Sequence, residues 1–328
     1  MTPESLAAVF GIKADTVTEL NTGHINRTCL ITSDSGRYIL QSLNPAVFTS
    51  PGTVERNLSE VIRCMSSAGD ISVPEYLSAP EGGLFLRSDG AAWRMYRYAD
   101  GGISAKETLF CAGYSCGAFM RTLGSGKPEL TSAIDGFHDI SHHFRQLTDA
   151  FGETETSAEH RELLSFLTEQ YERVCSVFSG LPLRPIHGDA KGDNFVLTGV
   201  PEDGTAIDLD NVMYSYAAVD YGDLIRSLAG AGDISAAEQL TEGFAAGLDG
   251  ALSPEEEDSL YDGVIYVTAE LAIRYLTDHL RGAVFFRSKT PEQCLERTRQ
   301  LCVQLRAFEA CENKFRSMTE RCFRKEQI

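Results

Sequence analysis

The residues of this chain that are best suited to chemistry on a phosphate group lie in the stretch 185–208. Asp189 is followed by Asn194 five residues later and by Asp208 nineteen residues later. A carboxylate such as that of Asp189 can accept a proton from a hydroxyl group, and the side-chain oxygens of Asn and Asp are hard ligands of the kind that Mg²⁺ prefers. The residue types therefore predict one proton acceptor and two metal ligands in a single site.

The spacing of these residues narrows the chemistry further. His187, Asp189 and Asn194 have the order His-x-Asp-x-x-x-x-Asn of a kinase catalytic loop, and a second acidic element follows at Asp208. In that arrangement the loop aspartate meets the acceptor hydroxyl, and the other two residues bind Mg²⁺ at the nucleotide phosphates. The alternative is a surface turn at 187–189 with Asp208 at a strand end. The presence of all three residues around a strand–turn–strand pattern opposes that alternative.

The first hundred residues read as strands and turns around one helix. Alternating runs that flank Gly- and Asp-containing turns predict two hairpins, 27–32 with 37–43 and 84–87 with 93–98. Between them, apolar residues at spacings of four, three and four predict a helix over 53–67. The predicted order is strand, strand, helix, strand, strand.

Helical periods dominate after the Gly-Gly pair at 101–102. Helices are predicted over 163–178, 253–281 and from residue 290 onward, the last two opened by a Ser or Thr N-cap followed by Pro. The Gly-Gly pair separates a β-rich lobe, residues 1–99, from a mainly helical lobe, residues 100–328. We therefore expect an α+β fold of two lobes, and clefts between two such lobes are common ligand sites.

Composition excludes several classes of protein. With 43% hydrophobic and 23% charged residues, the chain is typical of a globular protein and not of a disordered tail or a coiled coil. A formal net charge of −18 disfavours nucleic acid and anionic membranes as partners. The nine cysteines form no Cys-x-x-Cys pair, so we expect a reduced, cytoplasmic compartment. The start has no cationic leader and no window has the apolar length of a membrane span, so neither export nor membrane insertion is expected.

These residues resemble the aminoglycoside phosphotransferase and choline kinase group of small-molecule kinases, whose signature is HGD…N followed by ID. Within the group the sequence is most similar to the N-acetylhexosamine 1-kinases. The matching segments are TGHIN (22–26), RYILQ (37–41), FHD (137–139), HGDAKGDNF (187–195), IDLDNVM (207–213), DYGDLIR (220–226) and RYLTDHLRG (274–282). The resemblance implies a bilobal protein-kinase-like fold with a small antiparallel sheet in the first lobe. It also implies an ATP- and Mg²⁺-dependent enzyme that phosphorylates the anomeric hydroxyl of GlcNAc or GalNAc to the 1-phosphate.

The resemblance also assigns roles to individual residues of the second lobe. It implies that Asp189 is the catalytic carboxylate and that Asn194 and Asp208 are the Mg²⁺ ligands. His187 is expected to brace the backbone of the catalytic loop, and Asp220 is expected to brace the same loop from the next helix.

For ATP, the resemblance implies binding between the lobes, with adenine against the connector near Tyr98 and the phosphates under the loop that contains Gly23 and Asn26. One departure concerns the third strand, where kinases usually carry a lysine that pairs with the phosphates and this chain has Gln41. Glutamine brings no charge, so Mg²⁺ or Arg37 must neutralise more of the triphosphate.

For the acceptor, the resemblance places Lys191 beside the sugar and His24 facing the sugar or the phosphates. Arg274 and Arg287 are candidates to reach the sugar hydroxyls or the transferring phosphoryl group. The alternative for Arg274 is an ordinary surface ion pair with Asp278, which stands four residues further along the same predicted helix face.

Two other functions remain open at this point. A kinase of the same group with an aminoglycoside, choline or amino-alcohol acceptor would suit the negative net charge, and the tyrosines at 214, 216 and 221 offer cation–π contacts. The cationic side chains expected near the acceptor oppose that choice. A nucleotide-binding pseudokinase is permitted by Gln41 and opposed by the complete set of Asp189, Asn194 and Asp208. The oligomeric state is left open.

Overall fold

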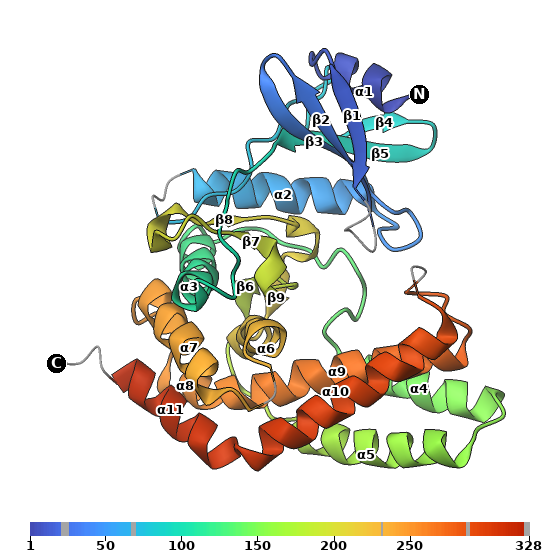
Figure 1. Cartoon of the computed structure of the whole chain (residues 1–328), viewed down its shortest axis with the longest axis vertical. Coiled ribbons are helices and arrows are strands. Elements are labelled where there is room, and N and C mark those ends of the chain that lie inside the picture. The colour runs from blue at the N-terminus through green and yellow to red at the C-terminus, as the bar shows by residue number, and fades with distance from the viewer. Residues whose placement is uncertain (21–25, 67–69, 231, 287–288, 325–328) are drawn as a thin grey trace.

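The protein consists of a small antiparallel sheet and a larger helical part, as the computed structural model of the chain shows (Figure 1). The structure describes residues 1–20, 26–66, 70–230, 232–286 and 289–324. Within these residues the sheet has the strand order β1-β2-β3-β5-β4, and all neighbouring strands are antiparallel. The expected α+β, protein-kinase-like fold is therefore confirmed. The strands are β1 (Thr16–Leu20), β2 (Arg27–Ser33), β3 (Gly36–Ser42), β4 (Leu86–Ser88) and β5 (Ala91–Arg97).

Both predicted hairpins are present in the sheet. In the first, Arg27 of β2 lies opposite Ser42 of β3, and the register continues to Ser33 opposite Gly36. One face of the sheet packs on a short helix, α1 (Pro3–Val9), which precedes all of the predicted elements. The core under this helix joins Leu6 of α1 to side chains on one face of the sheet, since every second side chain of a strand points to the same face. The strand residues are Cys29, Ile31, Leu40 and Met95.

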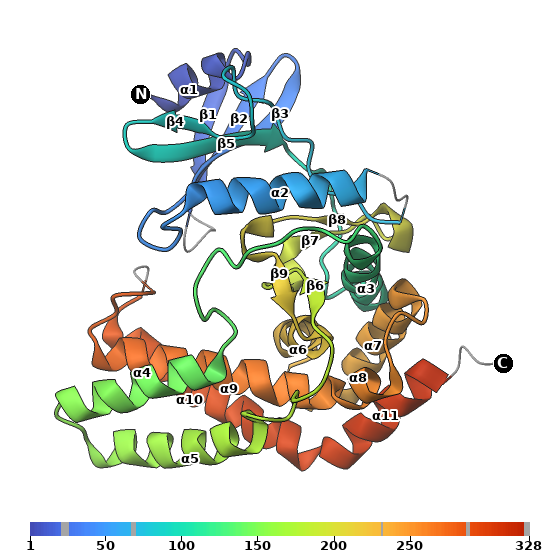
Figure 2. The same cartoon turned by 180° about the vertical axis from the view of Figure 1, so that it is seen from behind.

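Helix α2 (Pro51–Met65) lies between the sheet and the helical part (Figure 2). Near its start, Val54 packs in a small cluster with residues at the end of β3 and in β5. Leu58 and Val61, further along the same apolar face, belong to the main core of the helical part. Glu55 accepts hydrogen bonds from the backbone N–H groups of Leu84 and Phe85 at 2.7 and 3.0 Å. α2 therefore fixes the sheet and the helical part to each other.

The helical part differs from the predicted pattern at two breaks. The helix expected over 253–281 is divided at Ser259 into α8 (Pro254–Asp258) and α9 (Leu260–Leu280), and the final helix is divided at Cys311 into α10 (Pro291–Ala310) and α11 (Glu312–Arg324). Among the described residues, none of the helices has the length and apolar character that crossing a membrane requires. The other helices are α3 (Leu109–Ser125), α4 (Ile140–Glu153), α5 (Ala158–Val174), α6 (Ala217–Leu228) and α7 (Ile234–Leu248).

Four short strands at the centre of the molecule carry the predicted catalytic loop, residues 187–194. β6 (Arg184–Ile186) pairs with β9 (Met213–Ser215), and β7 (Phe195–Val196) pairs with β8 (Thr205–Ala206). Three single-turn 3₁₀ helices connect them: η1 (Gly192–Asn194), η2 (Pro201–Asp203) and η3 (Leu209–Asn211).

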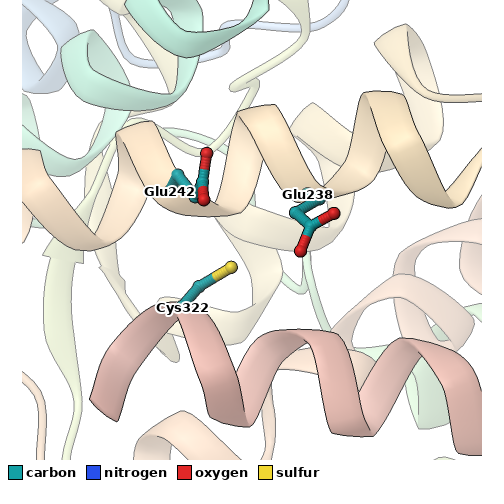
Figure 3. A group of neighbouring side chains, drawn as sticks. All are labelled: Glu238, Glu242 and Cys322. Atoms are coloured by element: carbon teal, nitrogen blue, oxygen red, sulfur yellow. The ribbon is translucent and has the colours of Figure 1, made fainter. Parts of the chain in front are cut away.

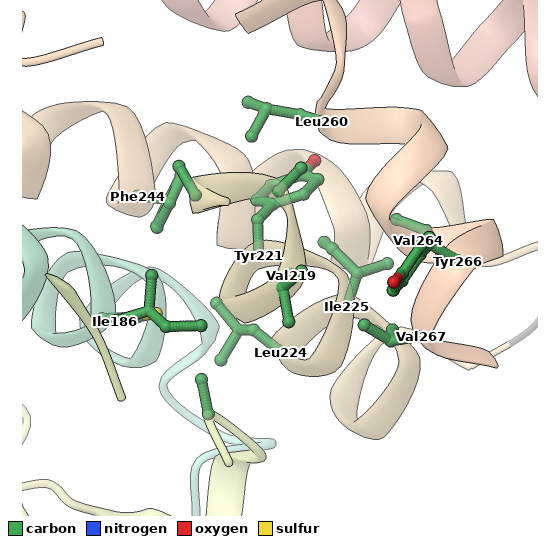
Figure 4. Packing of buried hydrophobic residues seen from close by; sticks show 14 of the residues in the cluster. Ile186, Val219, Tyr221, Leu224, Ile225, Phe244, Leu260, Val264, Tyr266 and Val267 are labelled. Atoms are coloured by element: carbon green, nitrogen blue, oxygen red, sulfur yellow. The ribbon is translucent and has the colours of Figure 1, made fainter. Parts of the chain in front are cut away.

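Helix α6 packs beneath these strands in the main hydrophobic core (Figure 4). Its Val219 and Leu224 lie in that core with Ile186 of β6 and Val264 of α9. The helices α6 and α9 approach each other closely because Gly222 has no side chain: a Cβ there would overlap the carbonyl group of Gly263. This close contact between α6 and α9 helps to fix the position of Asp220, which lies two residues before Gly222 on α6 and faces the loop 187–189.

Candidate active site

The side chains of the catalytic loop that follows β6 contact one another directly. The side-chain amide of Asn194 donates to the backbone oxygen of Asp189 at 2.7 Å and to its carboxylate at 2.9 Å. The ammonium group of Lys191 donates to the same carboxylate at 2.7 Å. The structure thus brings together three of the residues that the sequence singled out. Because Nδ2 of Asn194 is committed to Asp189, its Oδ1 is the atom that remains available to a cation.

The backbone of this loop is held by two buried side chains. The carboxylate of Asp220 accepts hydrogen bonds from the N–H groups of His187 and Gly188, at 2.7 and 2.9 Å. Nε2 of His187 donates to the backbone oxygen of Ile207 at 2.9 Å, which ties the loop to the segment that leads to Asp208. The predicted bracing roles of His187 and Asp220 are confirmed.

Gly188 has a left-handed backbone conformation and a close neighbour, and both favour glycine at this position. Its φ angle is +76°, in the left-handed region, and a Cβ atom on it would overlap the carbonyl oxygen of Asn211. A glycine is therefore needed directly before Asp189, where the chain reverses and the carboxylate must be presented.

The pKa values of the two carboxyl groups in the predicted site, Asp189 and Asp208, are shifted in opposite directions. Burial opposes ionisation of Asp189, but the Lys191 ammonium beside it holds the pKa of Asp189 below its ordinary value. Burial and then the nearby charges of Asp210 and Asp189 raise the pKa of Asp208 to about 6. Asp189 is therefore ionised at neutral pH, and Asp208 lies in an excess of negative charge that a divalent cation would neutralise.

The residues present fit a Mg²⁺ ion. Asp208 sits at φ 59°, in the left-handed region, at the start of η3, and its side chain makes no capping hydrogen bond to that helix. Its carboxylate and Oδ1 of Asn194 are the oxygen donors that would hold the ion, in keeping with the preference of Mg²⁺ for oxygen ligands.

A buried ion pair between Arg94 and Asp210 joins the sheet to this site. Both side chains are 1% exposed, and the Arg94 guanidinium donates to the Asp210 carboxylate. Asn26 donates to the other oxygen of that carboxylate at 2.7 Å. Burial disfavours the charge of Arg94, but Asp210 outweighs it and raises the pKa of Arg94. The predicted Asn26 thus bonds Asp210, which stands two positions after Asp208. The ion pair of Asp210 with Arg94 was not identified from the sequence.

Gln41 lies beside the same arginine. It faces Arg94 across the β3–β5 pairing, its Oε1 accepts from Nε of Arg94 at 3.0 Å, and its Nε2 donates to Thr28 at 3.1 Å. The third strand therefore has a cation next to the position of the missing lysine, supplied by its neighbour strand. An arginine inside the run WRMYR of β5 was the signal in the sequence that could have indicated it.

Arg37 and Tyr98 lie together at the other end of the sheet. The Arg37 guanidinium forms an ion pair with Asp100 and lies 4.5 Å from the centre of the Tyr98 ring, and the backbone N–H of Tyr98 donates to the backbone oxygen of Arg37 at 2.9 Å. Arg37 stands four residues before Gln41 on β3, roughly 13 Å along a strand. Its predicted contact with the triphosphate and that of Tyr98 with adenine stay predictions. Gly23, His24 and Arg287 lie outside the described residues.

Arg274 of α9 lies close to three aromatic rings from neighbouring segments. Its guanidinium carbon is 5.0, 5.1 and 5.8 Å from the ring centres of Phe137, Phe285 and Phe286, and its Nη1 donates to Glu270 at 3.4 Å. None of the contacts found in the described part of the chain joins Arg274 to Asp189.

Asp278 does not pair with Arg274, so the alternative of an ion pair between them is wrong. The Asp278 carboxylate instead accepts from the backbone N–H groups of Phe285 and Phe286 at 2.7 and 2.9 Å. Each oxygen of the carboxylate is occupied by one of these backbone donors from the turn after α9. It therefore helps to hold the aromatic rings over Arg274.

A separate acidic cluster on α7 and α11 is not assigned to the site. The side chains of Glu238, Glu242 and Cys322 offer ligand atoms within 4.8 Å of one another (Figure 3). Arg321 already donates to Glu238 at 3.1 Å, and neither helix carries a residue of the catalytic loop. We assign no metal to this cluster.

The chain is similar in sequence and in fold to known phosphotransferases. Residues 16–254 match the sequence profile described as the phosphotransferase enzyme family. The structure is similar to that of a microcompartment-associated aminopropanol kinase, with a TM-score of 0.70 and 15% identity over 95% of this chain and 97% of that chain. An aminoglycoside phosphotransferase from Alicyclobacillus acidocaldarius subsp. acidocaldarius DSM 446 gives a TM-score of 0.64 and 13% identity over 98% and 97% of the two chains.

A third similar structure was solved with bound small molecules. It is a spectinomycin phosphotransferase in complex with ADP and spectinomycin, with a TM-score of 0.57 and 15% identity over 99% of this chain and 97% of that chain. At these identities the likeness establishes the fold, and the acceptor has to be argued from the residues of this chain.

Proposed function

This chain belongs to the phosphotransferase enzyme family, and we propose that it transfers the γ-phosphoryl group of ATP to the anomeric hydroxyl group of an N-acetylhexosamine. The product would be the sugar 1-phosphate. The observation that carries the proposal is the contact of Asn194 and Lys191 with the carboxylate of Asp189, at 2.9 and 2.7 Å. A proton acceptor, a metal ligand and a cation thereby meet at one point, which is the set of groups that phosphoryl transfer to a hydroxyl requires.

Asp189 is the proposed base. Its pKa lies below the ordinary value because the Lys191 ammonium outweighs the effect of burial, so it is ionised and can accept the hydroxyl proton at neutral pH. An anomeric hydroxyl is more acidic than an ordinary alcohol, so a weak base suffices. The hydrogen bond from Asn194 fixes the orientation of the carboxylate, and Lys191 would also stabilise the charge of the transferring group.

Mg²⁺ would be held by Asn194 and Asp208, and when bound it neutralises charge on the phosphates. Adenine would lie against the connector near Tyr98, and the phosphates would lie under the loop that contains Gly23 and Asn26. Gln41 and Arg37 are the other proposed nucleotide contacts. Arg94 donates to Oε1 of Gln41 and so orients its amide group, while the charge of Arg94 is itself paired with Asp210.

For the acceptor we propose His24, Lys191, Arg274 and Arg287 as binding residues. The cationic Lys191 lies directly on Asp189, and Arg274 presents a guanidinium framed by aromatic rings. Positive charge favours hydroxyl groups and a departing phosphate over an ammonium group, and an aromatic ring can stack on the apolar face of a sugar. The second candidate is an amino-alcohol acceptor, because the aminopropanol kinase noted above has the same fold over nearly its whole length.

A side-by-side ADP-release assay separates these two candidates. Purified protein with Mg²⁺ and ATP is offered GlcNAc, GalNAc, their 1-methyl glycosides, choline, aminopropanol and kanamycin. We expect ADP release with the free N-acetylhexosamines and none with the 1-methyl glycosides, because a blocked anomeric oxygen has no proton to give up. Turnover of the methyl glycosides, or of the amines alone, would overturn the sugar 1-kinase proposal.

We further propose that the nucleotide-covering lobe comprises residues 1–99 and the catalytic lobe residues 100–328. The location we propose is the cytoplasm, in line with nine cysteines that are all free thiols. The proposed partner is a small sugar, and the proposal includes no nucleic acid and no membrane.

A further inference from the structure

His138 connects helix α9 to the backbone of the catalytic loop. It lies just before α4, at the end of the long segment that runs from α3 (Figure 2). Its Nδ1 is 3.0 Å from Oε2 of Glu270, and its Nε2 is 3.0 Å from the backbone oxygen of Gly188. Gly188 directly precedes Asp189. A continuous chain of contacts therefore leads from α9 to the residue that presents the proposed base.

With Glu270 ionised, these two contacts require both ring nitrogens of His138 to carry a proton. A backbone carbonyl oxygen only accepts hydrogen bonds, and an ionised carboxylate only accepts them as well, so Nε2 and Nδ1 must both donate. A histidine that donates from both nitrogens is a positively charged imidazolium. The side chain of Glu270 is 3% exposed, so this positive charge is matched by a carboxylate that has little contact with water.

The charges around His138 agree with this assignment. Burial disfavours the imidazolium, but Glu270 and the hydrogen bond to Gly188 outweigh burial and raise the pKa of His138 to about 9. The same imidazolium, with Arg274, holds the pKa of Glu270 below its ordinary value against the effect of burial. Asp223 of α6 also favours the charged ring.

The remaining polar neighbours come from α4 and α9. His143 of α4 lies 3.7 Å from Glu270, and burial lowers its pKa, so it adds no charge at neutral pH. The hydroxyl group of Tyr266 on α9 donates to the backbone oxygen of His138 at 2.8 Å. This contact fixes the backbone from which the imidazolium ring projects.

Both polar backbone atoms of Gly188 are thus held by charged side chains of opposite sign. The anionic Asp220 accepts from its N–H group at 2.9 Å, and the cationic His138 donates to its carbonyl oxygen at 3.0 Å. Hydrogen bonds to charged groups are among the strongest that a backbone makes. The peptide plane between Gly188 and Asp189 includes this carbonyl group, so its rotation is restrained at the point where the Asp189 side chain starts.

We propose that His138, kept charged by Glu270, is a positioning residue that orients Asp189 for proton transfer through the carbonyl group of Gly188. The inference rests on the proposed function and deepens it by adding a residue that positions the proposed base. His138 does not touch the substrate. It acts by limiting the directions in which the Asp189 carboxylate can point, and misplacement of a reacting group by about 1 Å costs roughly 100-fold in rate.

Three variants separate positioning from simple support of the fold. His138→Phe keeps a ring against Phe137, whose ring centre is 4.6 Å away, and removes both donors. His138→Gln keeps one donor that can reach Gly188 but no charge. The matched control is His143→Phe, because His143 belongs to the same cluster, has a similar exposed fraction and bonds Phe137 instead of the catalytic loop.

Activity is measured as Mg²⁺-dependent ADP release, both with the best acceptor and with water alone, so that the result does not depend on the identity of the acceptor. We expect His138→Phe to lower kcat roughly 10- to 100-fold while the KM for ATP stays within about twofold. His138→Gln should recover part of kcat. His143→Phe should leave kcat within about twofold of the parent protein, even if its thermal stability falls as far as that of His138→Phe.

A pH titration gives a readout that a purely structural role would not change. The seven histidines are followed by NMR of their ring protons. One imidazole, absent from His138→Phe, should remain charged until the pH approaches about 9. In the parent protein, kcat should fall at alkaline pH as His138 loses its charge. In Glu270→Gln the pKa of His138 should fall because burial is no longer offset by a charge. The fall in kcat should then move to lower pH by the same amount.

The outcomes are distinguishable. Retention of kcat in His138→Phe, or the lack of any imidazole that stays charged above about pH 8, overturns the positioning role. If the parent protein releases no ADP with water or with any acceptor, the proposed function is overturned, and the positioning of a base by His138 is overturned with it. The NMR titration tells these cases apart, because it reports the His138–Glu270 pair without turnover.

Discussion

Arg94 and Asp210 form an ion pair that is sealed from water between the β-sheet and the catalytic loop, each side chain being 1% exposed. Arg94 belongs to β5, and Asp210 stands two positions after the proposed metal ligand Asp208. This buried contact therefore joins the sheet that would cover ATP to the segment that would bind the metal.

Removing one partner of this pair should destabilise the protein strongly. In Arg94→Met, Asp210 would keep a buried charge with only Asn26 to compensate it, and breaking a buried ion pair in this way costs about 3–5 kcal/mol. Equilibrium unfolding in urea measures the loss. The control is Arg97→Met on the same strand, since Arg97 and Glu75 form an exposed pair, and exposed ion pairs contribute little to stability. Equal losses in the two variants would contradict the importance of burial at Arg94.

Asp189→Asn should abolish turnover and preserve nucleotide binding. The asparagine retains the shape and the contact with Asn194 but cannot accept a proton, and general base catalysis typically contributes about 100- to 10,000-fold in rate. Steady-state ADP release gives kcat, and calorimetry with Mg-ATP gives the affinity. Asp193→Asn, an exposed carboxylate on the same loop, is the matched control and should keep its kcat. A loss of activity of the same size in both variants would argue against Asp189 as the base.

Stability without metal should fall as the pH rises through the range in which Asp208 loses its proton. Because the pKa of Asp208 is raised from 3.8 to about 6, the folded protein binds this proton more tightly than the unfolded chain does. This contribution is complete below about pH 4 and is lost as the pH rises through about 6. Thermal unfolding in EDTA between these pH values measures it, with Asp208→Asn as the comparison.

Mg²⁺ should reverse this effect in the parent protein. Binding should become tighter as the pH rises to about 6 and should release a proton below that value, because the ion competes with the proton for the Asp208 carboxylate. In Asp208→Asn, both the proton release and the stabilisation by Mg²⁺ should disappear. An unchanged response to Mg²⁺ in that variant would place the ion elsewhere.

Gly188→Ala should be far more harmful than an equivalent change at Gly250. Both glycines have left-handed backbones, with φ angles of +76° and +72°. A Cβ at Gly250 would meet nothing within 4 Å, whereas one at Gly188 would overlap Asn211. Gly250→Ala should therefore cost only the conformational penalty of about 1–2 kcal/mol, and Gly188→Ala should cost more and also lower kcat. Thermal unfolding of the two variants, compared with ADP release, tests the difference.

The breaks in the long helices show where sequence periodicity is insufficient. The apolar spacing runs past Ser259 and Cys311, and capping residues and proline mark the starts of α8 and α10 correctly. Nothing in the local pattern requires an end at these two positions. α11 turns back so that Phe315 packs against Tyr261 of α9, with ring centres 5.4 Å apart, which is a contact between residues 54 positions apart in the sequence.

The catalytic loop could be predicted from the sequence because its chemistry is local: Asp189, Lys191 and Asn194 stand within six residues, and a tight loop brings such neighbours into contact whatever surrounds it. The hairpins and α2 were predictable for the same reason, since turn residues and apolar periods act over short distances. The pairings of Arg94 with Asp210 and of His138 with Glu270 were not, because their partners are separated by 116 and 132 positions. A charged residue in an apolar run has no preferred partner until the fold excludes water around it, so only the tertiary structure decided which carboxylate each of these cations would meet.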